Sequence, residues 1–148
     1  MGIATPLKRL AILGSTGSIG RQTLDIVRST PGFQVVGLAA GRNHDLLAQQ
    51  VAEFRPSFVA YDGDSPLVAP AIPRLTLEEL AAHPDVDLVV VGTVGKAGLL
   101  PALAALKAGK AVALANKEVF VAAGHIVTET AQRYGGTLLP VDSEHSAL

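Results

Sequence analysis

The feature that most constrains this chain is a glycine-rich stretch at residues 14–20, GSTGSIG. The apolar residues 10–13 before it predict a buried parallel strand, and residues 21–27 after it predict a helix. Gly14 can make a tight turn, Gly17 lets an anion approach the backbone, and Gly20 lets the helix pack closely on the strand. Amides at the helix start then favour an anion. We therefore predict that this turn binds the diphosphate of a dinucleotide.

The spacing of these glycines is Gly-x-x-Gly-x-x-Gly, which differs from the commoner Gly-x-Gly-x-x-Gly. Because any tight strand-to-helix turn uses glycine, the three glycines alone are weak evidence. The apolar run before them and the helical pattern after them favour the dinucleotide interpretation.

Composition narrows the fold and the range of partners. The 148 residues are 49% hydrophobic but only 4% aromatic, which is typical of parallel sheets covered by helices. A formal net charge of −1 indicates neither a nucleic-acid nor a membrane-surface partner. The chain has no cysteine and no apolar run that could span a bilayer, so we expect a cytoplasmic protein without disulfides or thiolate metal sites.

Predicted strands and helices alternate along the whole chain. This pattern predicts an α/β fold, a doubly wound, mainly parallel sheet of the Rossmann type with helices on both faces. We expect residues 1–148 to form one nucleotide-binding domain. The predicted strands are residues 10–13, 33–39, 57–61, 87–91, 110–115 and 137–141, and the predicted helices are residues 18–29, 45–54, 76–82, 99–108 and 119–134.

Ligands of such sheets bind beyond the carboxyl ends of the strands, so the residues after each strand carry the functional prediction. The second strand is followed by Gly41, Arg42 and Asn43, without the carboxylate that usually binds the ribose of NAD. A guanidinium can pair with a 2′-phosphate, so Arg42 predicts NADP(H) rather than NAD(H). The alternative is a solvated surface arginine.

Two further loops contribute polar or small residues to the same predicted edge. Residues 92–98 are small and glycine-rich, and leave room for the ribose and nicotinamide of a cofactor; a flexible loop explains them nearly as well. The fifth strand runs directly into Asn116, Lys117 and Glu118. These side chains suit a substrate or cofactor, although Asn116 and Glu118 also suit the capped start of a helix.

The sixth predicted strand leads into Asp142, Ser143, Glu144 and His145. Alternate residues of an extended chain face the same side, so Asp142 and Glu144 present two carboxylates together. Paired carboxylates suit Mg²⁺ or Mn²⁺. Such a pair is weak evidence on its own, because solvated carboxylates are common, but its position at a strand end favours a metal site.

Three of these stretches together resemble the 1-deoxy-D-xylulose 5-phosphate reductoisomerase family. They are GSTGSIG at residues 14–20, NKE at residues 116–118 and PVDSEHSA at residues 140–147. The resemblance extends over nearly the whole chain, and the last two motifs are the specific ones. It implies an NADPH-dependent enzyme of isoprenoid biosynthesis that converts a phosphorylated ketose to 2-C-methyl-D-erythritol 4-phosphate with a divalent metal ion. It also implies a homodimer of the full-length protein.

The resemblance also assigns roles to individual residues. It implies cofactor contacts at Thr16, Gly17, Ser18 and Ile19, at Gly41, Arg42 and Asn43, and at Asn116 and Glu118. It implies substrate contacts at Lys117, Ser143 and Glu144, with Lys117 and Glu144 taking part in catalysis. It implies metal ligands at Asp142 and Glu144.

The family's chain is much longer than this one, and that length sets a further expectation. The third metal ligand, the mobile flap and the substrate-phosphate groups belong to later parts of the family's chain. We therefore expect these 148 residues to bind NADPH weakly without turnover. The alternatives are another NADP-dependent reductase of the semialdehyde-dehydrogenase type, which needs a nucleophilic cysteine, and a nucleotide-sensing domain.

Overall fold

All six strands of the computed structural model run parallel, in the order β3-β2-β1-β4-β5-β6. The structure describes residues 7–63, 71–93, 95–115 and 117–140. Within these, the sheet grows from its centre in both directions, which confirms the predicted doubly wound topology. The strands are β1 (Lys8–Leu13), β2 (Phe33–Ala39), β3 (Phe58–Ala60), β4 (Leu88–Val91), β5 (Ala111–Leu114) and β6 (Thr137–Pro140).

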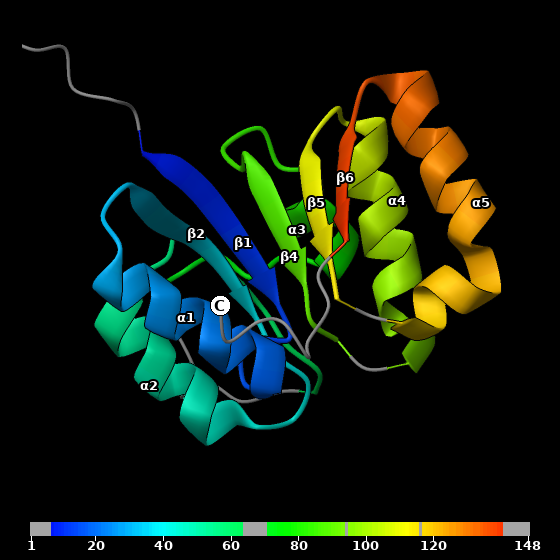
Figure 1. Cartoon of the computed structure of the whole chain (residues 1–148). Helices are drawn as coiled ribbons and strands as arrows, with labels where there is room; N and C mark the ends of the chain where they lie inside the picture. The colour runs from blue at the N-terminus through cyan, green and yellow to red at the C-terminus, as the bar shows by residue number, and fades with distance from the viewer. Residues whose placement is uncertain (1–6, 64–70, 94, 116, 141–148) are drawn as a thin grey trace, which may run out of the picture.

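Helices cover both faces of this sheet, as Figure 1 shows. One face packs against α1 (Ser18–Ser29) and α2 (His44–Phe54), and the other against α3 (Leu77–Ala81), α4 (Leu99–Lys107) and α5 (Lys117–Tyr134). A short 3₁₀ helix, η1 (Gly95–Gly98), leads into α4. No helix in the described ranges combines the length and hydrophobicity that a bilayer crossing needs.

The burial of β1 on both faces explains why this strand lies in the interior of the sheet. Leu10, Ala11, Ile12 and Leu13 are all buried, and Ala11 and Leu13 enter one core cluster whereas Ile12 enters the opposite one. Each fully buried leucine or isoleucine contributes about 1.5–3 kcal/mol relative to an exposed one. An uninterrupted apolar run is therefore stable only at the centre of a sheet that is covered on both sides.

The predicted elements exist, with ends that differ by up to two residues. The capping box at Thr76 is confirmed, because its hydroxyl accepts from the Glu79 N–H at 3.1 Å and the Glu79 carboxylate accepts from the Thr76 N–H at 2.9 Å. Helix α5 begins two residues before the predicted start. It also bends at Ala123, which has φ −146° and ψ 27° (Figure 1).

A bidentate ion pair joins the first and fourth strands at their amino ends. Arg9 donates to the Asp87 carboxylate from Nε and Nη2, each at 3.1 Å, and from its backbone N–H at 2.9 Å. These hydrogen bonds hold the pKa of Asp87 below its ordinary value. The carboxylate therefore stabilises the fold above the pKa of an unfolded aspartate, and this contribution is lost as the pH falls through the lowered pKa of the folded state.

We expect Asp87→Asn to lower the melting temperature by a few degrees at pH 7, because the substitution removes the charge that pairs with Arg9. The difference from the parent chain should shrink as the pH falls below about 4, where aspartate becomes protonated. Thermal unfolding between pH 2 and pH 8 measures both effects. Glu129→Gln on α5 is the control, and a difference that stayed constant down to pH 2 would contradict the assignment.

Candidate dinucleotide-binding site

The first glycine of the turn is required by backbone geometry. Gly14 has φ +87°, and a Cβ on it would lie 2.9 Å from the carbonyl carbon of Gly92 at the end of β4. The N–H groups of Gly14 and Ser15 both donate to the Ala39 carbonyl at 2.8 Å, at the end of β2. The turn is therefore fixed between its two neighbouring strands, as expected from the strand order.

The second and third glycines serve different needs. A Cβ on Gly20 would lie 2.2 Å from the Gly14 carbonyl oxygen and 2.5 Å from the Ser15 Cα, so α1 packs directly on the turn. A Cβ on Gly17 would meet the protein no closer than 3.5 Å, again at the Gly14 oxygen. Packing therefore requires glycine at position 20. At position 17 a side chain would not clash with the protein, so packing does not explain the glycine there.

Backbone amides around Gly17 are available to a ligand. Gly17 is the N-cap residue of α1 and provides no side-chain cap, and the first turn of α1 contains no acidic residue. Among the described residues, no backbone or side-chain group accepts from the N–H groups of Thr16, Ser18 or Ile19. Unpaired amides at the positive end of a twelve-residue helix favour an anion.

Thr16 and Gly17 line a cavity of about 320 Å³ at the carboxyl edge of the sheet. The loops that follow β1, β2, β3 and β4 contribute to its walls, together with the start of α3 and the 3₁₀ helix η1. Its lining residues are Gly14, Thr16, Gly17, Ala39, Ala40, Gly41, Asp62, Leu77, Gly92, Thr93 and Ala97. A neighbouring cavity of about 400 Å³ shares Ala40, Asp62 and Leu77 with it, so the two together extend along the edge toward β3.

The loop after β2 provides a cation beside this cavity. Arg42 is exposed, and in the described part of the chain no side-chain ion pair or hydrogen bond involves its guanidinium. Asn43 next to it caps α2, because its carboxamide oxygen accepts from the Leu46 N–H at 3.2 Å. His44 is turned to the protein, with Nε2 2.7 Å from the Asp62 carbonyl oxygen and its ring edge-on to Tyr61.

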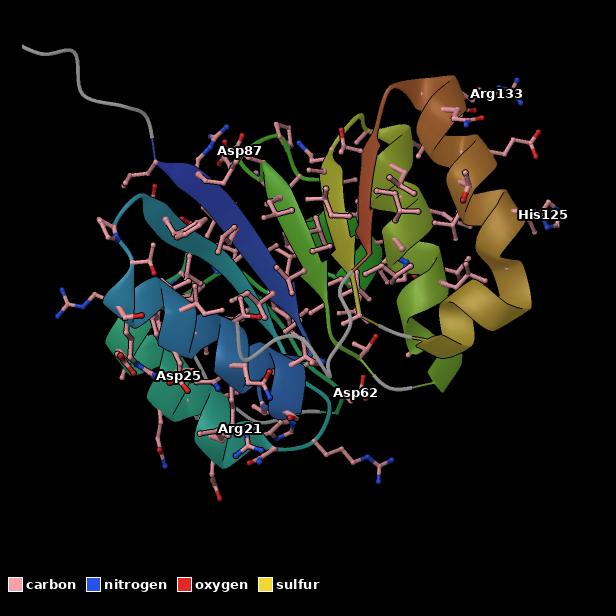
Figure 2. All side chains as sticks on the ribbon, in the orientation of Figure 1. Arg21, Asp25, Asp62, Asp87, His125 and Arg133 are labelled. Carbon is pink, nitrogen blue, oxygen red and sulfur yellow. The ribbon has the colours of Figure 1, made fainter. Side chains whose placement is uncertain are left out.

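Sequence reasoning missed Asp62 as a residue of this site. Its N–H donates to the Gly41 carbonyl at 3.0 Å, and a Cβ on Gly41 would lie 3.6 Å from its carboxylate. Figure 2 places Asp62 at the end of the sheet where the loops leave the strands. Its position directly after the third strand was the available signal, because every strand end at this edge faces the ligand side.

The remaining predicted site residues fall partly or wholly outside the description. Asn116, Asp142, Ser143 and Glu144 lie outside the described residues, and Lys117 and Glu118 are described only as backbone in the first turn of α5. Strands β5 and β6 do end at the same edge as the glycine turn. Within the described ranges, no three histidine or acidic side chains gather as metal ligands.

The all-parallel sheet in this strand order, with helices on both faces, defines a Rossmann-like α/β fold, and the glycine turn and the cavity lie at its carboxyl edge. A profile of the family described as 1-deoxy-D-xylulose 5-phosphate reductoisomerase matches residues 10–124. The chain therefore belongs to the 1-deoxy-D-xylulose 5-phosphate reductoisomerase family.

Individual relatives agree with this assignment. The chain is 48% identical over 155 residues to the reductoisomerase of Pelotomaculum thermopropionicum, covering 96% of this chain and 40% of that protein. A crystal structure of a reductoisomerase in complex with NADPH, fosmidomycin and magnesium matches with a TM-score of 0.87 and 42% identity, covering 94% of this chain and 37% of the other. The structure of the Zymomonas mobilis reductoisomerase in complex with NADPH matches with a TM-score of 0.84 and 36% identity, and the match covers 96% of this chain and 40% of that one. The chain thus spans about two fifths of the length of these relatives.

Proposed function

We propose that this chain is the NADPH-binding domain of a 1-deoxy-D-xylulose 5-phosphate reductoisomerase. The observation that supports this best is the combination at one edge of unpaired amides around Gly17 and the exposed guanidinium of Arg42. A diphosphate fits the amides and the helix dipole, and a 2′-phosphate fits the guanidinium. The solved structures of two relatives in complex with NADPH support the same nucleotide.

For the whole protein, we propose the conversion of 1-deoxy-D-xylulose 5-phosphate to 2-C-methyl-D-erythritol 4-phosphate, with NADPH as the hydride donor. Lys117 would bind the substrate, and Asn116 and Glu118 the ribose or nicotinamide end of the cofactor. This proposal is supported by the position of β5, whose carboxyl end lies beside that of β4 at the edge with the glycine turn.

Asp142 and Glu144 are the proposed ligands of a divalent ion, and Ser143 a substrate contact. The chemistry of two carboxylates suits Mg²⁺ or Mn²⁺, and a relative's structure contains magnesium. The ion would bind neighbouring substrate oxygens and offset negative charge that develops on them. Both carboxylates follow β6, which ends at the same edge as β5.

The binding proposal is tested by titrating the chain with NADPH and, separately, with NADH while the nicotinamide fluorescence is followed. We expect saturable binding of NADPH and affinity at least tenfold weaker for NADH, because only NADPH offers the 2′-phosphate to Arg42. Equal affinity for the two would remove the 2′-phosphate assignment, and no binding of either would overturn the proposed function.

A second assay addresses turnover. Incubated with NADPH, Mg²⁺ and 1-deoxy-D-xylulose 5-phosphate, these 148 residues produced on their own should oxidise no NADPH at a steady rate. This expectation rests on their spanning about two fifths of the length of the relatives. A steady decrease in absorbance at the nicotinamide band would contradict it, and the reductoisomerase of a relative serves as the positive control.

A further inference from the structure

One buried polar side chain of α2 contacts the backbone of the glycine turn. Gln50 lies between Leu47 and Val51 on the buried face of the helix and is only 4% exposed. Apolar side chains are the rule on such a face, because a buried carboxamide is unfavourable unless it is hydrogen-bonded. A buried glutamine at this position therefore requires a hydrogen-bond partner in the protein.

The hydrogen bond that Gln50 makes is directed at the turn. Its Nε2 donates to the Ser15 carbonyl oxygen at 2.9 Å, across 35 positions of the sequence. The orientation of the carboxamide follows from this contact, since a carbonyl oxygen can only accept. Within the described residues the Gln50 Oε1 atom has no partner, so the protein contact that explains this side chain is the one to Ser15.

Fixing the Ser15 carbonyl also fixes the amide that follows it. The carbonyl of Ser15 and the N–H of Thr16 belong to one planar trans peptide and point in opposite directions. Because Gln50 holds the carbonyl toward the interior, the N–H of Thr16 is directed away from α2. That N–H has no acceptor among the described residues, and Thr16 lines the cavity at the carboxyl edge.

The other side of Ser15 is fixed as well. Its N–H donates to Ala39 at the end of β2, and the residue is completely buried. The backbone of the turn is thus held by β2 at one peptide and by α2 at the next. A turn held at both peptides presents its amides without an ordering penalty when an anion binds.

We propose that Gln50 is a positioning residue that directs the Thr16 amide toward the diphosphate of the bound dinucleotide. This inference rests on the proposed function, in that the anion it serves is the diphosphate of NADPH. Gln50 itself does not reach the ligand and acts through the Ser15–Thr16 peptide.

The test compares Gln50→Met with Gln49→Met. Methionine has a similar length and cannot donate, and Gln49 is the exposed neighbour on the same helix. The probes are NADPH and adenosine 2′-monophosphate, which lacks the diphosphate. We expect Gln50→Met to weaken NADPH binding about tenfold, the loss expected for one misdirected hydrogen bond, and to change the affinity for adenosine 2′-monophosphate less than about twofold. Gln49→Met should change neither.

Two outcomes would overturn the inference. One is unchanged NADPH affinity in Gln50→Met, and the other is an equal loss for both probes, which would indicate a general effect on the domain. A measurement on the ligand-free protein tests the positioning role of Gln50 independently of the proposed function. Even if the parent chain bound no NADPH, the NMR signal of the Thr16 amide should shift in Gln50→Met and stay in Gln49→Met, and an unshifted signal would refute the positioning role.

A measurement on the parent chain covers the case in which Gln50→Met does not fold. The Gln50 carboxamide protons should exchange slowly with solvent, and their NMR signals should move when NADPH binds, because the bound diphosphate polarises the peptide that they contact. Fast exchange of these protons, or NMR signals that do not move when NADPH binds, would overturn the proposal.

Discussion

Gly20→Ala is expected to destabilise the domain by about 3 kcal/mol or more, a large part of the stability of a domain of this size. The added methyl would lie 2.2 Å from the Gly14 carbonyl oxygen and 2.5 Å from the Ser15 Cα. Both contacts are with backbone, so no rotation of a side chain can relieve them, and α1 must move away from the sheet. Chemical denaturation followed by circular dichroism measures the loss.

Gly17→Ala is the matched control, because the same methyl is added three residues earlier. Here the nearest protein atom would be 3.5 Å away, and the φ of −82° is one that alanine adopts readily. We expect a loss of stability below about 1 kcal/mol, from the poorer helix cap alone. NADPH affinity should nevertheless fall about tenfold or more, because the methyl occupies space that the diphosphate needs. Equal stability of the two variants would contradict the division of roles between these glycines.

The fold was predictable from sequence because its elements carry local signals. Helix α1 and strand β2 were predicted to the residue, since the glycine turn and Pro31-Gly32 mark their ends. The end of β3 was not predicted to the residue, because the length of this strand depends on its pairing with other parts of the chain. Residues 73–75 run beside it, with the Val59 N–H donating to the Pro73 carbonyl at 3.1 Å and the Val59 carbonyl accepting from Leu75 at 2.8 Å.

The bend in α5 shows a different limit. The apolar spacing of residues 119–134 predicts one continuous helix, whereas the structure has a non-helical residue at Ala123. Gly124, which follows it, has a low helix propensity and was the available signal. A single glycine costs only about 1 kcal/mol in a helix, so it does not decide between a straight and a bent helix.

Residues of the candidate site could be proposed from sequence where they are contiguous in the chain, and not where folding brings them together. The turn at residues 14–20 and Arg42 follow strands directly, and the strand-end rule finds them. Leu77 lines the cavity only because α3 begins at the carboxyl edge, which no local pattern indicates. Gln50 carried a signal, as a polar residue within an apolar helical face, but its partner Ser15 is 35 residues away.

Arg42→Ala is expected to weaken NADPH binding about 10- to 100-fold and NADH binding less than about twofold. The range corresponds to the loss of a charge-assisted pair with a phosphate. The reason lies in the surroundings of Arg42, because residues 40–43 after β2 include no acidic residue, and the described contacts leave this guanidinium unpaired. A 2′-phosphate would be its partner, and NADH has none.

Fluorescence titrations of both nucleotides at several salt concentrations measure this effect. The advantage of NADPH over NADH should narrow with added salt in the parent chain, because an exposed charge pair is screened, and should be small at every salt concentration in Arg42→Ala. Arg133→Ala is the matched control, since it removes the same exposed charge from α5, far from Asp62 and the carboxyl edge (Figure 2). If Arg42→Ala lowered the affinity for both nucleotides equally, the arginine would act on the shared part of the cofactor, and the preference for NADPH would need another source.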